Sequence, residues 1–128
     1  MGSGIETVAH VKENGRIVLM FCAFDGNPGI ARLHRKACII EACEPKFDEW
    51  IHHFASRDGV RAVIVADCQR VSTTCGFGVP VITFEGHRGE LLNWCNRQGE
   101  EGLVDYQRRK NRISLDRLPG INVFRSGD

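Results

Sequence analysis

The sequence lacks several features that mark special classes of protein. No apolar stretch approaches the roughly 18 residues that span a bilayer, and the amino end lacks the basic-then-apolar pattern of a secretory signal. The 17 Lys and Arg side chains nearly balance the 16 Asp and Glu side chains, so the net charge of +1 gives no strong attraction to nucleic acid or to an anionic membrane. These absences predict a cytoplasmic protein that has neither a membrane nor a nucleic acid as its partner.

A cysteine-based metal site is also missing from the pattern. The six cysteines include no Cys-x-x-Cys pair, and the adjacent His52 and His53 would point in different directions on a helix. Without a secretory signal, cysteines among small apolar residues are expected to be reduced and buried. Cys75 lies between turn residues, but no histidine is near it in the sequence to activate a thiolate. We therefore predict no metal site and assign no catalytic side chain.

The chain is expected to form one domain over residues 1–128, mainly of β-strands with helices, in the α+β class. The longest apolar run, residues 16–24, carries β-branched and aromatic side chains and predicts a strand buried on both faces. Further strands are predicted over 30–43, 60–71 and 79–84, and helices over 4–13, 46–56, 89–98 and 100–112. Four strands are too few for a closed, packed barrel, which takes about six to eight.

The start of the first predicted helix is a candidate anion site. Ser3 and Glu6 form the Ser-x-x-Glu pattern of a capping box, and Asn14-Gly15 is a plausible left-handed end to the helix. Free N–H groups and the dipole at a helix start favour an anion, to which Ser3, Gly4 and Thr7 would donate hydrogen bonds. A plain helix cap explains the same residues.

Three further candidates lie on the first two predicted strands. Arg16 opens the apolar run and suits either an anion or a structural ion pair. Arg32 and His34 alternate with apolar residues on the returning strand, and His34 is a side chain whose charge changes near neutral pH. Arg32 and His34 either face a ligand or form the solvent-exposed side of a half-exposed strand.

Four stretches, in order along the chain, resemble the pyridoxamine 5'-phosphate oxidase-like family of FMN-binding split barrels. They are residues 3–24, the Ala-Arg-Leu-His at 31–34, the Ser-Thr-Thr-Cys-Gly-Phe-Gly-Val-Pro at 72–80, and residues 101–120. The match is to one uncharacterised branch of the family. Arg16 fits the Asn-x-Arg signature of the family.

The resemblance implies a six-stranded split barrel, usually a homodimer, with FMN held across the subunit interface. It implies that Ser3, Gly4, Thr7, Arg16, Arg32 and His34 surround the flavin nucleotide. Well-studied members supply Arg and Lys to the FMN phosphate from the loop that corresponds to residues 4–7, where this chain has no basic residue. Members also carry additional residues before the point where this chain begins, so we expect a barrel that is incomplete at its amino end.

Two functions follow from these expectations. The first is an FMN-dependent oxidoreductase of unknown substrate, whose redox chemistry is carried by the flavin. The second is a truncated or degenerate split barrel that binds no flavin and acts as a non-enzymatic binding or dimerisation module. The absence of phosphate-binding cations favours the second, and the intact later motifs favour the first.

Overall fold

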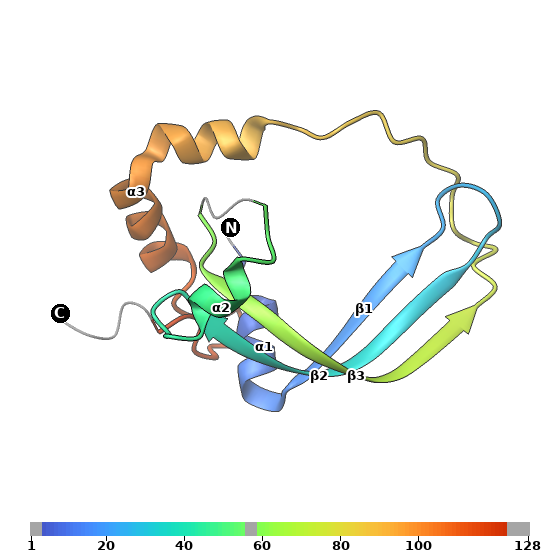
Figure 1. The fold of residues 1–128 in the computed structure, drawn as a ribbon, viewed down its shortest axis with the longest axis horizontal. Helices are drawn as coiled ribbons and strands as arrows, with labels where there is room; N and C mark the ends of the chain where they lie inside the picture. Colours follow the sequence, from blue (N-terminus) through green and yellow to red (C-terminus); the bar gives the residue numbers. More distant parts are fainter. Residues whose placement is uncertain (1–3, 56–58, 123–128) are drawn as a thin grey trace.

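A three-stranded antiparallel sheet forms the centre of the structure, a computed structural model that describes residues 4–55 and 59–122 (Figure 1). The strands are β1 (Arg16–Cys22), β2 (Ile30–Glu41) and β3 (Ala62–Thr74); the helices are α1 (Glu6–Asn14), α2 (Phe47–Ile51) and α3 (Glu90–Lys110). Strand β2 lies between β1 and β3, which are the two edges of the sheet. The antiparallel sheet with helices confirms the α+β class.

Helix α1 ends in the way that the Asn-Gly pair predicts. Gly15 has a φ of 70°, and its N–H donates to the carbonyl of Val11 at 2.8 Å. A positive φ at the end of a helix costs glycine little, because glycine has no Cβ. The N–H of Arg16 then donates to Oδ1 of Asn14 at 2.9 Å, so the helix turns directly into β1.

The pairing of the strands divides their side chains between two faces of the sheet. Paired residues of an antiparallel sheet point to the same face, and successive residues alternate. Residue 36 of β2 pairs with residue 16, residue 34 with residues 18 and 70, and residue 32 with residue 20. One face, which we call the basic face, therefore carries Arg16, Arg32, His34, Lys36 and Arg70. The odd-numbered residues of β2 lie on the other face, which we call the helix face because α1 packs there.

The core lies at one end of the sheet. Ile5 and Val8 pack with Ile121 near the carboxyl end of the described chain, and Ile39 of β2 packs against this cluster. Its neighbour Ile40 points to the opposite face and is also buried. Helix α2, in which Ile51 is buried, packs against β3. At this end the sheet is thus covered on both faces.

A buried ion pair fixes α1 to the end of β2. Glu41 is only 2% exposed, and one of its carboxylate oxygens accepts a hydrogen bond from Nζ of Lys12. The other oxygen accepts the backbone N–H of Asn122 at 2.5 Å. Lys12 also donates to the carbonyl of Gly120 at 2.5 Å. The pair therefore joins α1, β2 and the segment after α3.

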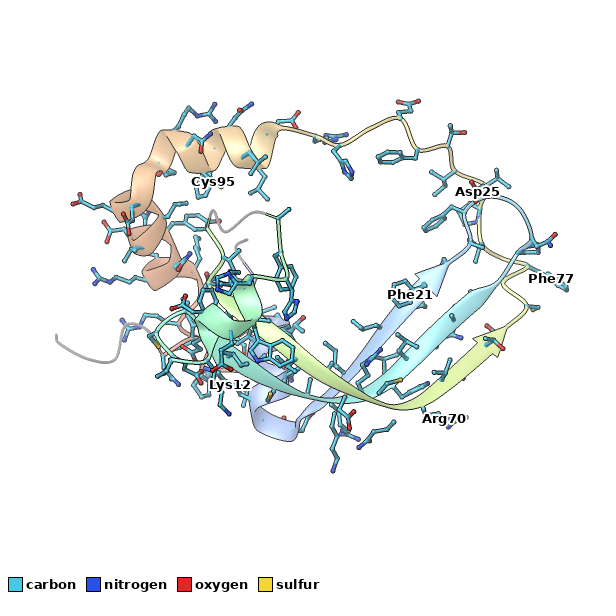
Figure 2. The ribbon with its side chains drawn as sticks, in the orientation of Figure 1. Lys12, Phe21, Asp25, Arg70, Phe77 and Cys95 are labelled. Carbon is cyan, nitrogen blue, oxygen red and sulfur yellow. The ribbon has the colours of Figure 1, made fainter. Side chains whose placement is uncertain are left out.

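The other end of the sheet is largely uncovered in this chain. Val18, Phe21 and Val71 are 52%, 58% and 60% exposed, and Phe21 lies toward the end of β1 far from α1 (Figure 2). Residues 16–22 do form a strand, but the prediction that it is buried on both faces is wrong. Strand β1 is an edge strand, and α1 and α2 cover only the opposite end of the sheet. The apolar run therefore forms an exposed surface.

We expect this uncovered end to make the chain self-associate, because exposed apolar edge strands pair readily with other chains. Sedimentation velocity should show a species heavier than the monomer that increases with protein concentration. Phe21→Lys should shift the distribution toward the monomer, whereas Leu115→Lys, at an exposed position outside the sheet, should leave it unchanged. A wild-type chain that sediments as a monomer at every concentration would contradict this expectation.

The segment between the sheet and α3 differs most from prediction. Residues 79–84 form no strand; the chain runs as an extended connection from the end of β3 to α3 (Figure 1). Ile82 donates its N–H to the carbonyl of Phe24 at 2.9 Å. Pro80 has no N–H to donate, which weakens this segment as a strand. The chain bends after β3 at Gly76, which has a φ of 65°. A Cβ at this position would lie 2.6 Å from the backbone nitrogen of Gly29, so only glycine fits there.

The helices also have different bounds from those predicted. The helices expected over 89–98 and 100–112 are merged into α3, with a kink at Gly99, whose φ is 65° and ψ is −179°. The helix expected over 46–56 ends at Ile51 and has only five residues. Over residues 4–55 and 59–122, the helices are either too short or too polar to cross a bilayer.

The cysteines are free, but the prediction that they are buried is wrong for most of them. Cys95 is buried and its Sγ lies 2.8 Å from the carbonyl of Leu91, and Cys22 is half-buried. The exposed cysteines are Cys38, Cys43, Cys68 and Cys75. Apolar neighbours in the sequence did not imply burial, because much of the sheet is uncovered in this chain.

Candidate functional site

A cavity of about 390 Å³ lies at the amino end of α1. Its walls come from residues 4–8 and from the segment that leads into β3, residues 60–64. Gly4 and Thr7, two of the predicted anion-binding residues, are in the wall; Ser3 lies outside the described residues. The first N–H groups of a helix have no partner within the helix, so this end of α1 favours an anion.

Arg61 supplies the cation that the sequence around residues 4–7 lacks. Its guanidinium donates to the carbonyl of Gly4 at 2.5 Å and to Oδ1 of Asn111 at 2.7 Å. Both of these acceptors are neutral oxygens, and Asn111 is fully buried. Burial lowers the pKa of Arg61 from its usual value, and an arginine remains charged at neutral pH even so. A positive charge thus lies beside the helix start.

Sequence reasoning missed Arg61 because 57 residues separate it from Gly4 and no motif connects them. It lies immediately before Ala62, where β3 begins. Only the pairing of β3 with the end of β2, next to α1, brings its side chain to the cavity.

The carboxylate of Glu6 interacts with Leu115 and His10. Helix α1 begins at Glu6 with Ile5 at the N-cap position, where no described side chain makes a capping hydrogen bond. Ser3, the other half of the predicted capping box, lies outside the described residues. Oε1 of Glu6 instead accepts the N–H of Leu115 at 3.0 Å. Its Oε2 lies 3.9 Å from Nε2 of His10. Glu6 therefore interacts with groups on the outer side of α1, although it also borders the cavity.

Arg16, Arg32 and His34 lie together on the basic face. The NH1 nitrogen of Arg32 donates to Oγ1 of Thr74 at 3.1 Å, and Nε2 of His34 lies 3.2 Å from Oγ of Ser72. These contacts orient the two side chains along β3. The predicted alternation of Arg32 and His34 with apolar residues on β2 is present.

The structure does not bring all the predicted site residues together. Ile39, against which α1 packs, points to the helix face, whereas Arg16, Arg32 and His34 point to the basic face. Gly4 and Thr7 lie at the amino end of α1 and thus on the helix-face side. Within one chain, the candidate residues form two groups on opposite sides of the sheet.

The fold and the cavity define an α+β protein in which a helix start and a guanidinium form a site suited to an anionic group. The chain is 36% identical, over an alignment of 138 residues, to the pyridoxamine 5'-phosphate oxidase family protein ustO of Aspergillus flavus. This similarity confirms the resemblance at the level of the family: the chain is a homologue of a pyridoxamine 5'-phosphate oxidase family protein.

The alignment covers 94% of this chain and 55% of the Aspergillus protein. The chain therefore spans about half the length of the curated relative that it matches. No protein-family model and no solved structure matches the chain.

Proposed function

We propose that this chain is a flavin-binding protein of the oxidoreductase type, with a split-barrel fold and with the phosphate of FMN at the amino end of α1. The observation that carries the proposal is the placement of Arg61 beside Gly4 and Thr7 in one cavity. The homology to a pyridoxamine 5'-phosphate oxidase family protein supports it. When bound, FMN would supply the redox chemistry, and the protein would bind it, orient it and exclude water.

The residues at the cavity fit a phosphate group. Arg61 supplies a charge-assisted donor, Thr7 supplies an exposed hydroxyl, and α1 supplies unpaired N–H groups at its positive end. Glu6 would repel a phosphate, but its oxygens interact with Leu115 and His10. The phosphate would thus approach from the side of Arg61.

Arg16, Arg32 and His34 would act from a second copy in a homodimer. Because they lie across the sheet from the cavity, we infer that they contact the flavin ring or the substrate bound to the partner chain. The uncovered end of the sheet, which carries Val18 and Phe21, supplies apolar surface for such a contact.

The second candidate function is a dimerisation or binding module without flavin. The large exposed apolar surface on the sheet favours it, since such surfaces mark interaction sites. It differs from the first proposal in one measurable property, which is the affinity for FMN.

Comparing FMN with riboflavin, which lacks the phosphate, tests the proposed site directly. We expect the full chain to bind FMN more tightly than riboflavin in a fluorescence titration. Arg61→Met should remove a charge-assisted hydrogen bond and weaken FMN binding about tenfold or more, with little effect on riboflavin. Thr7→Val, at an exposed position, should also weaken only FMN binding and carries less risk to the fold.

The matched control is Thr73→Val, which removes a hydroxyl from an exposed position at the other end of the sheet. Equal affinities for FMN and riboflavin, or equal losses for both in the two cavity variants, would show that the phosphate does not bind here. No flavin binding at all would favour the non-enzymatic module.

A further inference from the structure

Three metal-ligand side chains meet on the outer side of α1. Glu6 and His10 are four residues apart, so both lie on one face of the helix. Asp116 approaches them from the segment after α3, and Nε2 of His10 lies 3.0 Å from Oδ2 of Asp116. The three ligand atoms all lie within 4.8 Å of one another.

The two elements that carry these side chains are held in place independently of the side chains themselves. Helix α1 is fixed by Ile5 and Val8 in the core. The turn that carries Asp116 is closed at its base by buried Ser114, whose carbonyl accepts the N–H of Arg117 and whose hydroxyl accepts the N–H of Leu118, both at 3.0 Å. The cluster therefore joins two well-packed parts of the chain.

Glu6 is oriented by a contact outside the cluster. Its Oε1 accepts the N–H of Leu115, which leaves Oε2 toward His10. Hydrogen bonds of this kind orient the ligands of known metal sites and are important for affinity. The donor to Glu6 comes from the residue next to Asp116, so one turn positions both carboxylates.

The spacing of the ligand atoms fits a small divalent ion. Bonds of about 2.0–2.2 Å in a tetrahedral arrangement put neighbouring ligand atoms about 3.3–3.6 Å apart. The separations of 3.0 Å and 3.9 Å around His10 lie on either side of that range. Two carboxylates would balance the charge of the ion, and the partial exposure of the three side chains leaves its remaining position open to solvent.

We propose that Glu6, His10 and Asp116 bind a divalent transition-metal ion, with zinc as the preferred ion. The imidazole favours zinc over magnesium or calcium, which prefer oxygen ligands alone. Sequence reasoning found no metal site because it compared the spacings of cysteine and histidine, whereas this site combines a helix pair with a carboxylate 106 residues beyond His10. The proposal is independent of flavin binding.

The test is calorimetric titration of the full chain with zinc chloride after the exposed thiols have been alkylated. Alkylation is needed because Cys38, Cys43, Cys68 and Cys75 are exposed and would bind zinc themselves. We expect a single zinc to bind, and Asp116→Asn or His10→Gln to weaken its binding at least tenfold. Asp116 is largely exposed, so its substitution does not endanger the fold.

His53→Gln is the matched control, because it removes an exposed histidine outside the cluster and should leave zinc affinity unchanged. Zinc should also raise the melting temperature of the wild-type chain by several degrees, and not that of Asp116→Asn. Zinc binding that is equal in all variants, or absent from the wild type, would overturn the proposal and leave the cluster as an ion pair only.

Discussion

Replacing Lys12 by methionine is expected to lower the free energy of unfolding by about 3 kcal/mol. Glu41 is 2% exposed, and without Lys12 its carboxylate would remain buried without a counter-charge. Removing one partner of a buried ion pair typically costs about 3–5 kcal/mol. We expect the lower end of this range, because the N–H of Asn122 still donates to the carboxylate. Urea denaturation followed by circular dichroism measures the change.

The double variant Lys12→Met with Glu41→Met separates the charge effect from the loss of packing. It should be more stable than Lys12→Met alone, because no charge is left buried. Asp105→Asn is the control for an exposed pair: its oxygen lies 3.6 Å from NH1 of Arg108, and its loss should cost less than about 1 kcal/mol. A double variant no more stable than the single one would show that the charge of Glu41 is not the cause.

Gly120→Ala is expected to destabilise the chain by about 3 kcal/mol. A Cβ at this position would lie 2.1 Å from the carbonyl oxygen of Asn111 and 2.7 Å from Cγ1 of Ile5. Neither neighbour moves easily, because Asn111 and Ile5 are buried and the N–H of Ile121 donates to that same carbonyl. Overfilling a packed site typically costs about 1–3 kcal/mol, and contact with backbone places this one at the upper end.

Gly78→Ala is the matched control, because nothing lies within 4 Å of its Cβ position. Its effect should be within about 0.5 kcal/mol of the wild type. The melting temperature of Gly120→Ala should fall by several degrees, whereas that of Gly78→Ala should not. A Gly120→Ala chain that melts with the wild type would contradict the close packing of residues 111 and 120.

The elements with strong local signals were predictable from the sequence. Gly15 ends α1 because its local geometry needs a positive φ, and the run that begins at Arg16 forms β1 because its β-branched and aromatic residues suit a strand. Residues 79–84 were not predictable in this way. Their apolar residues resemble a strand, but a strand also needs a neighbouring strand, and residues 79–84 pair with none of the strands β1, β2 and β3. Ile82 instead donates its N–H to the carbonyl of Phe24, in the loop after β1.

Burial was the property that local patterns predicted least well. Phe21 is apolar in an apolar run and is nevertheless 58% exposed, because burial depends on which other elements cover the sheet. Ile39 is partly buried on one face and Ile40 is buried on the other, since α1 and α2 lie over that end. The sequence of one strand contains no information about these distant elements.

The residues of the candidate sites also differ in how far they could be predicted from the sequence. Gly4 and Thr7 were predictable because a helix start is a local feature, and Arg32 and His34 because they alternate along one strand. Arg61 and Asp116 were not, because each reaches its partners only through the packing of segments far apart in the sequence.

The joining of the two ends of the described chain has a consequence for synthesis of the protein. Ile5 packs with Ile121, Lys12 donates to Gly120, and Arg61 donates to Asn111. The emerging chain can form the hairpin of β1 and β2 early, but the core around α1 is complete only after residue 121 has left the ribosome. Contacts this distant in sequence form slowly, so Ile5 and Val8 lack part of their cover until residue 121 has emerged. Chaperone binding during translation is therefore expected at α1.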